Sequence, residues 1–437
     1  MEEWKEYNLG DLVELKNGVA FKSSEFIESG IPVIKIKNVK PNKILLDDLS
    51  YVSEHSSQNK KCFDILPSDI LITMTGNRKD GGPDSWVGKV ALFGKSGRYL
   101  LNQRVSAIRV KRKDLVEYQY LAYILSCWDA QLYFVNHSNS SGGQANISPD
   151  VVYGYNVTLP SLSEQTRIAA ILSSLDDKIE VNRRINDNLE QQAQALFKSW
   201  FVDFESFKNG KFVESELGMI PKGWRVGTYS DIIQETISGD WGKEKEEGNY
   251  THKVACIRGC DFHDVKMGLR GKTPERFILE KNYQTKHFED KDVLVEISGG
   301  TATVSTGRIC PVSQFLIDKF EGDIVCTNFC RLVRPIKGYS SYLYYSWKYK
   351  YDHKVMFGYE NGTSGIKNFS IKDFSSREPL ILPELSALNE FENIIDHIHT
   401  QIQNCGSESA KLATLRDTLL PKLMSGELKV NDIENSL

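Results

Sequence analysis

"LPSLSEQTRIAAILSSLDDKI" runs from Leu159 to Ile179 and begins the most strongly periodic segment of the 437-residue chain. From here apolar residues recur every seven positions and polar residues fill most places between them, which predicts a long amphipathic helix with a coiled-coil seam. Pro160, followed by Ser161 as a possible N-cap and by Glu164 in the first turn, marks the start of this helix. A helix with one apolar stripe needs a partner.

The partner is predicted from a second copy of the pattern, "LPELSALNEFENIIDHIHTQI", which runs from Leu382 to Ile402. We expect the two helices to pack in antiparallel orientation, with Asn182 as the polar residue that fixes their register. The predicted pairing residues are Ile168, Leu175, Asn182, Leu189 and Leu196 in the first helix and Phe391, Ile398, Cys405, Leu412 and Leu419 in the second. The intervening seam positions are expected at Ile171, Ile185, Ile394 and Leu415.

The sequence before each helix is also repeated. "SDILITMTG" from Ser68 matches "KDVLVEISG" from Lys291, and "YLAY" at Tyr120 matches "YLYY" at Tyr342. Because these landmarks keep their order, the chain is predicted to be a tandem duplication of a strand-rich globule followed by a helix. The fold class is therefore α+β, with two β-rich mixed α/β globules joined by two long antiparallel coiled-coil helices. The expected boundaries are 1–160, 161–205, 206–382 and 383–437.

Composition and charge allow a nucleic-acid partner. The chain is 40% hydrophobic and 26% charged, as expected for a globular protein. No apolar run of about 18 residues occurs and the start is acidic, so we expect no membrane span and a cytoplasmic location. The net charge of the chain is -4, and its acidity is concentrated in the two helical segments. Each globule is mildly basic and has the charge to present a basic face to DNA.

Motifs for catalysis are missing from the sequence. It contains no G-x-x-x-x-G-K-[ST] phosphate loop and no "NPPY" or "DPPY" string of the kind found in amino-methyltransferases. Two E-x-K fragments that a nuclease would need, at 14–16 and 427–429, have no convincing upstream acidic partner, so chance occurrence is the preferred interpretation.

Two C-x3-C spacings, Cys256 with Cys260 and Cys326 with Cys330, raise the question of a zinc site. His252 and His263 lie close to the first pair in the sequence. The cysteines stand in strand-like apolar runs, however, and the first globule has no counterpart. Buried free thiols are therefore preferred, and no metal is expected.

The order of landmarks resembles that of the DNA-specificity (S) subunits of type I restriction-modification systems. The strings "RINDNLEQQAQALFKSWFVDF", "ESELGMIPKGW" and "LRDTLLPKLMSGEL" carry the resemblance, which covers essentially the whole chain. It implies two target recognition domains that each read one half of a bipartite double-stranded DNA site. It also implies spacer helices that dock two methyltransferase (M) subunits, a core to which restriction (R) subunits bind, and no catalytic residues in this chain. S-adenosylmethionine, ATP and Mg are then expected in the partner subunits, with no cofactor here.

Candidate DNA contacts are polar and basic residues in Gly-rich loops, because these types reach phosphates and base edges. The candidates in the first globule are Lys35 and Lys37, expected to alternate on one strand face, with Arg78, Lys79, Asn139, Ser140, Ser141 and Gln144. Those in the second globule are Arg258, Lys266, Arg270, Lys272, Asn361, Thr363, Ser364 and Lys367. Any one of these loops could instead be simply solvated.

Two other functions are compatible with the sequence. The chain could be a coiled-coil scaffold whose globules bind proteins, or a fused restriction-methylation enzyme. Missing methyltransferase and motor motifs argue against the enzyme. In the DNA-reading interpretation, two globules at opposite ends of antiparallel helices would contact half-sites roughly one helical turn, about 34 Å, apart.

Overall fold

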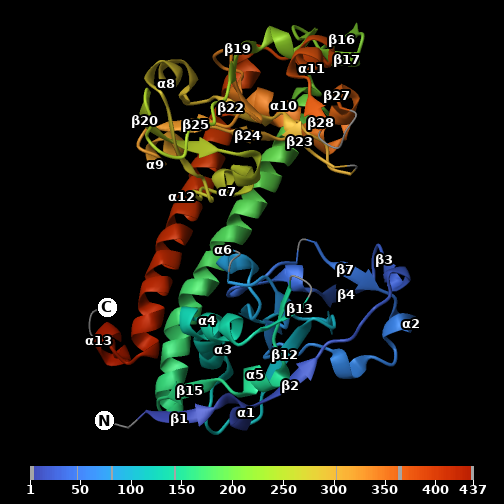
Figure 1. The fold of residues 1–437 in the computed structure, drawn as a ribbon. Helices are drawn as coiled ribbons and strands as arrows, with labels where there is room; N and C mark the ends of the chain where they lie inside the picture. The colour runs from blue at the N-terminus through green and yellow to red at the C-terminus, as the bar shows by residue number, and fades with distance from the viewer. Residues whose placement is uncertain are drawn as a thin grey trace. The chain divides into compact units, whose positions relative to one another are not determined.

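The computed structural model of the chain describes residues 4–46, 48–79, 82–141, 144–301, 303–362 and 367–434. The elements form two units (Figure 1). Unit 1 comprises Met1–Asp177 and Ala413–Leu437, and unit 2 comprises Lys178–Leu412. Each unit contains one strand-rich globule together with a part of each long helix.

A four-stranded antiparallel sheet forms the centre of the globule in unit 1, in the order β10-β8-β12-β2. Its strands are β10 (Val90–Leu92), β8 (Ile70–Thr73), β12 (Val105–Val110) and β2 (Val13–Asn17). Ile70 and Ile72 belong to the core cluster that includes helix α3 (Tyr118–Ser126), whereas Leu71 belongs to a second apolar cluster. Successive side chains point to opposite faces of a strand, so β8 is buried on both faces. This explains why its sequence "ILIT" does not alternate.

Two smaller sheets complete the first globule. One has the order β11-β4-β7-β3 and contains a parallel pair, β11 with β4. Its strands are β11 (Leu100–Leu101), β4 (Ile31–Ile34), β7 (Ser50–Val52) and β3 (Phe26–Ile27). The other has the order β13-β14-β9, with β13 (Asn139–Ser141), β14 (Gln144–Asn146) and β9 (Thr75–Gly76).

The globule of unit 2 repeats this arrangement. Its central sheet has the order β19-β26-β22-β24, formed by β19 (Ile233–Ser238), β26 (Cys330–Pro335), β22 (Val293–Glu296) and β24 (Ile309–Pro311). A second sheet contains the parallel pair β20 (Tyr250–Ile257) and β25 (Ile324–Cys326), and a third has the order β23-β28-β27. The strands of the third sheet are β23 (Ser298–Gly299), β28 (Lys367–Phe369) and β27 (Glu360–Asn361). The predicted tandem duplication is therefore confirmed. The central and third sheets agree strand by strand, whereas the second sheet has four strands in unit 1 and three in unit 2.

A buried ion pair occurs at the same place in both globules. The Arg109 guanidinium donates two hydrogen bonds of 2.7 Å to the carboxylate of Asp69, which is fully buried. In unit 2 the Arg334 guanidinium donates two bonds of 3.0 Å to Asp292, which is 1% exposed. Removing one partner would leave an uncompensated buried charge, which is strongly destabilising. Both residues of this ion pair are present in each of the two repeats.

The two long helices are α6 (Leu162–Phe201) and α12 (Leu385–Met424). In unit 1, Arg167 donates a hydrogen bond to Asn431, and Asp176 accepts one from Arg416. Residue numbers therefore rise along α6 while those of its partners fall, so the two segments run in opposite directions. In unit 2 the side-chain amide of Asn182 donates to Cys405 and Ser409, and that of Asn186 donates to Ile402. The two helices therefore also run in opposite directions within unit 2. The predicted antiparallel pair of helices is confirmed.

Burial along the helices follows a period closer to 3.6 than to 3.5 residues. Ile168, Asn182 and Phe391 are fully buried, whereas the other predicted pairing residues, Leu175, Leu189, Leu196, Ile398, Cys405, Leu412 and Leu419, are half-buried. The intervening positions were wrongly predicted in three cases, because Ile185, Ile394 and Leu415 are 40%, 36% and 47% exposed. In each unit, residues of both helices also pack in the core of the globule, so one broad stripe is buried and the narrow heptad seam is not followed.

A close approach between α12 and the globule of unit 2 requires glycine on the helix. A Cβ atom at Gly406 would lie 2.0 Å from the carbonyl oxygen of Met267 and 2.6 Å from Cα of Gly268. Asn186 of α6 donates a hydrogen bond of 3.2 Å to the same Met267 carbonyl. Gly406 therefore lets a loop of the globule touch the backbone of the helix.

In each unit a tyrosine hydroxyl makes a polar contact between a shorter helix of the globule and one of the long helices. In unit 1 the Tyr123 hydroxyl of α3 donates to Asp176 at 2.6 Å. In unit 2 the Tyr345 hydroxyl, on α10 (Ser340–Asp352), lies 3.0 Å from Nε2 of His399. Tyr345 and His399 are the repeat counterparts of Tyr123 and Asp176. The contact is kept although one partner has changed from a carboxylate to an imidazole.

The end of α12 and helix α13 (Val430–Glu434) belong to the core of unit 1. Leu423 and Val430 are fully buried there, and Leu420 is 7% exposed. These residues pack in the same cluster as Leu9 and Leu12 from the start of the chain. The first globule is thus completed by residues that are more than 400 positions apart in the sequence.

Candidate nucleic-acid interface

Exposed polar side chains gather around the sheet β13-β14-β9 of unit 1. Arg78 and Lys79 follow β9, Asn139 begins β13 and Gln144 begins β14, and all four are exposed. Arg104, which precedes β12 and is also exposed, donates from Nη1 to Oε1 of Gln144 at 2.8 Å. We call these five residues the β9 surface. Ser140 and Ser141 lie on β13, and their side chains are outside the described part of the structure.

The β9 surface is attached to the central sheet by backbone and side-chain hydrogen bonds. Met74 N donates to the carbonyl oxygen of Arg104 at 3.0 Å, and Ile147 N donates to the carbonyl oxygen of Met74 at 3.1 Å. The Thr75 hydroxyl donates to Oδ1 of Asn146 at 2.7 Å. Polar side chains on such a fixed frame can make hydrogen bonds to a ligand without first ordering a loop.

The corresponding place in unit 2 is the sheet β23-β28-β27. Asn361 of β27 lies opposite Asn368 of β28, as Asn139 lies opposite Asn146 in unit 1. The Ser298 hydroxyl donates to Oδ1 of Asn368, which repeats the bond between Thr75 and Asn146. We define the β23 surface as Phe329, Glu360, Asn361, Lys367 and Asn368. Thr363 and Ser364, predicted as contacts, lie outside the described residues.

The two surfaces differ in charge and polarity. Arg78, Lys79 and Arg104 form no ion pair with a carboxylate in the part of the chain that the structure describes. On the β23 surface Lys367 donates to Glu360 at 2.8 Å, and Phe329 stands where Arg104 stands in unit 1. The β9 surface is therefore the more basic of the two and favours a polyanion more strongly.

Lys35 and Lys37 do not lie on a strand, so this prediction was wrong. Strand β4 ends at Ile34, and both lysines belong to the 3-10 turn Ile36–Asn38 and its N-cap. Asn38 accepts the backbone N–H of Lys35 and thereby closes this turn. The Lys35 ammonium lies 3.5 Å from the centre of the Phe26 ring, and that of Lys37 pairs with Asp48. Their role in DNA binding stays a prediction.

The remaining predicted contacts of unit 2 lie elsewhere on the globule. Arg258, the repeat counterpart of Lys35, donates two hydrogen bonds of 2.9 and 3.0 Å to Asp261 and one of 2.7 Å to the carbonyl of Lys272. The Arg270 guanidinium lies 4.8 Å from the Phe320 ring, and Lys266 is half-buried. The structure therefore does not bring these four residues onto the β23 surface.

Arg104 and Phe329 were not predicted from the sequence, although a signal for them exists. Aligning "LNQRVSAIRV" from Leu101 with "CTNFCRLVRP" from Cys326 places the two residues in register. The alignment also superposes the arginines of the two buried ion pairs. Neither segment is a Gly-rich loop, so a flexible polar stretch does not mark Arg104 or Phe329 in the sequence.

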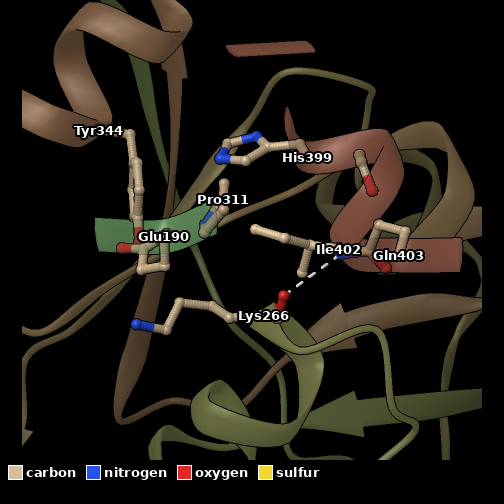
Figure 2. A pocket seen from close by; sticks show the side chains of 8 residues that line it. Glu190, Lys266, Pro311, Tyr344, His399, Ile402 and Gln403 are labelled. Atoms are coloured by element: carbon tan, nitrogen blue, oxygen red, sulfur yellow. Dashed lines mark hydrogen bonds between the residues drawn. The ribbon is translucent and has the colours of Figure 1, made fainter. Parts of the chain in front are cut away.

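A small cavity in unit 2 lies beside α10 and α12 (Figure 2). Its volume is about 20 Å³, enough for one water molecule. Its lining includes Glu190, Lys266, Tyr344 and His399, and the Gln403 side chain donates to the Lys266 carbonyl at 3.5 Å. Burial lowers the pKa of His399 to about 4, so its imidazole is neutral at pH 7. The cavity is too small for an organic substrate.

The cysteines of the two C-x3-C spacings differ in exposure. Cys256, Cys326 and Cys330 are buried, whereas Cys260 is exposed. Burial raises the pKa of the Cys256 and Cys330 thiols to about 12, which keeps them protonated and poor as metal ligands. Among the described residues no group of three or more His, Cys, Asp or Glu side chains could hold a metal ion.

The chain is similar to the DNA-specificity subunits of type I restriction enzymes. A sequence model of the type I restriction modification DNA specificity domain matches residues 1–191. The type I restriction enzyme HindI specificity subunit of Haemophilus influenzae is 24% identical over 98% of this chain and 100% of its own length. The MjaIX specificity subunit of Methanocaldococcus jannaschii is 28% identical over 74% of this chain and 71% of its own length.

The fold has a solved counterpart. The crystal structure of the S subunit of a type I restriction-modification system from M. genitalium aligns with a TM-score of 0.53 and 15% identity, over 97% of this chain and 96% of that one. The likeness extends over both globules and both long helices. Within the described residues, no helix is both long and apolar enough to cross a membrane.

Proposed function

We propose that this chain, whose residues 1–191 match the type I restriction modification DNA specificity domain, is the subunit that recognises DNA sequence in a type I restriction-modification complex. One observation carries the proposal. The same frame occurs twice and presents a polar surface at the same place in each copy, but with different side chains. Two similar readers with different contact residues suit a bipartite site with two different halves.

The β9 and β23 surfaces are the proposed places of contact. Asn139 and Asn361 occupy equivalent positions, and asparagine amides pair with the N6 and N7 groups of adenine in the major groove. Arg78 and Lys79, which follow strand β9 of the same sheet as Asn139, supply positive charge for phosphates. Direct readout and backbone contact would thereby be combined around one short sheet.

The partners and cofactors follow from the family and are part of the proposal. Two methyltransferase subunits would bind this chain and supply the S-adenosylmethionine chemistry, and restriction subunits would supply ATP and Mg-dependent cleavage. This chain would be non-catalytic and would work in the cytoplasm. The 40-residue length of both α6 and α12 supports a spacer role for these helices.

A selection experiment tests the proposal. The full chain, assembled with its methyltransferase subunits and S-adenosylmethionine, is incubated with random-sequence duplexes at several salt concentrations, and bound DNA is sequenced. We expect enrichment of two short motifs separated by a fixed gap of unspecified bases. If no sequence is enriched over competitor DNA at any salt concentration, DNA recognition is wrong, and a scaffold whose globules bind proteins becomes the better interpretation.

Matched variants connect the enriched sequence to the β9 surface. Arg78→Ala combined with Lys79→Ala should weaken binding to all duplexes, because phosphate contacts carry little sequence information. Lys113→Ala is the control, since Lys113 is exposed beyond the opposite end of β12. Equal binding by the double variant and the control would remove the β9 surface from the interface.

A further inference from the structure

Arg104 and Phe329 occupy the same position in the two globules. Met74 N donates to the carbonyl of Arg104, and Ile297 N donates to the carbonyl of Phe329 at 2.8 Å. The next link of the frame is also repeated, because Ile147 N donates to the Met74 carbonyl and Phe369 N donates to the Ile297 carbonyl. The two side chains therefore leave equivalent backbone positions beside the β9 and β23 surfaces.

The Phe329 ring is exposed, and the backbone around it is fixed by hydrogen bonds. It is 63% exposed, the largest fraction among the exposed large hydrophobic side chains that the structure describes. Its own N–H donates to the Thr327 hydroxyl at 3.3 Å, and Cys330 N donates to the Thr327 carbonyl at 2.9 Å. Burying this ring against a ligand would remove apolar surface from water and would order little backbone.

The neighbours of Phe329 indicate which ligand would cover the ring. Asn361, Asn368 and Lys367 lie on the two strands of the sheet beside it, and these residue types read base edges in the major groove. The apolar group that the major groove offers is the C5-methyl of thymine, and phenylalanine is one of the side chains that contact it. An arginine at the same position of the other globule would select guanine instead.

We infer that Phe329 is a specificity-determining residue that contacts a thymine methyl group in the half-site read by unit 2. The inference rests on the proposed function and adds to it the base that this position selects. It also accounts for the change from arginine to phenylalanine within a frame that is otherwise repeated, because each side chain selects a different base at the same place.

The test removes only the methyl group from the DNA. Once the enriched site is known, each of its thymines is replaced in turn by deoxyuridine, and the affinity of the assembled complex is measured by fluorescence anisotropy. We expect one replacement in one half-site to weaken binding of the natural chain about fourfold, the effect of one buried methyl-sized group. Phe329→Ala should bind the thymine and deoxyuridine duplexes equally, and Phe329→Leu should keep part of the preference.

Controls separate this contact from other effects. Met219→Ala removes another side chain that is 56% exposed in unit 2, on strand β17 (Gly218–Pro221), and should leave the thymine preference unchanged. The inference is overturned if the natural chain is indifferent to deoxyuridine at every position, or if Phe329→Ala keeps the full preference. Bending of DNA that depends on Phe329, with thymine and deoxyuridine bound equally, would instead indicate a minor-groove wedge.

The failure of this inference and the failure of the proposed function give different results. If DNA recognition itself is wrong, the natural chain enriches no sequence and both proposals fall. If only the role of Phe329 is wrong, the natural chain binds its bipartite site and the thymine replacements have no effect that depends on residue 329.

Discussion

Arg104 and Arg109 are five residues apart, but only Arg109 has an arginine at the equivalent position of the second globule. Arg109 pairs with buried Asp69, and its counterpart Arg334 keeps the same bond to Asp292. Arg104 is exposed, and its counterpart is Phe329. A buried charge needs its partner, whereas an exposed side chain is free to change with the ligand. Residues that differ between equivalent exposed positions are therefore the best candidates for specificity.

Arg104→Ala should lower DNA affinity and reduce its dependence on salt. If the guanidinium contacts a phosphate, its loss makes the slope of log K against log salt concentration shallower by about 0.9. If it contacts a base edge, affinity falls mainly for one sequence and the slope changes less. Binding titrations at four salt concentrations distinguish the two. Affinity equal to that of Lys113→Ala at every salt concentration would show that Arg104 has no contact with DNA.

The positions of the candidate contact residues were only partly predictable from sequence, and their contact with DNA stays a prediction. Asn139, Gln144 and Asn361 were chosen because they stand in repeated polar stretches, and the structure places them on equivalent sheets. Lys35 and Lys37 were placed on a strand because a turn of three residues closed by Asn38 has no periodic signal. Arg104 and Phe329 became visible only when the backbone bonds to Met74 and Ile297 fixed their equivalence.

The long helices were the most predictable elements, because forty residues of regular spacing leave little ambiguity. Their entry at Ser161 was also correct, since Glu164 N donates to the Ser161 hydroxyl at 3.4 Å. The prediction was wrong about which face of each helix is buried. Ile185 and Leu415 were assigned to the seam from a heptad template, but the globules bury a wider stripe than a helix pair alone would bury.

Gly406→Ala should destabilise unit 2 despite the better helix propensity of alanine. The added Cβ would meet the Met267 carbonyl at 2.0 Å, so the loop or the helix must move. Overpacking of this kind costs about 1–3 kcal/mol, more than the roughly 1 kcal/mol gained in propensity. Urea denaturation measures the change in the free energy of unfolding. Ser407→Ala, one residue away on α12, is the control, and equal stability of the two variants would contradict the clash.

At the scale of the whole molecule, each long helix contributes residues to both units. Inserting four helical residues between Asp177 and Lys178, matched by four between Leu412 and Ala413, adds about 6 Å of helix. That is the rise of about two base pairs of DNA. The gap between the two half-sites should lengthen while the bases of each half-site stay the same. Sequencing of selected or methylated DNA measures the gap, and changed half-site bases with an unchanged gap would contradict the spacer role.

The arrangement of two globules and two helices was predictable because the two halves of the sequence can be compared with each other. Two copies of each landmark showed which features recur, and the order of strands in both central sheets agrees with that duplication. The contribution of residues 413–434 to unit 1 was not predicted. A short apolar segment such as the one containing Leu420 and Leu423 gives no sign of which core it joins, because burial against a distant globule leaves no local pattern.

The segment 413–434 has a consequence for how the protein is made. Domains generally fold as units during synthesis, the N-terminal one first. Here unit 2 is one continuous stretch of chain, while the core of unit 1 includes Leu423 and Val430. The globule of unit 1, most of which is made before unit 2, therefore stays incomplete until residues 413–434 have been made. A nascent chain that ends at residue 412 would contain all of unit 2 but only part of the core of unit 1.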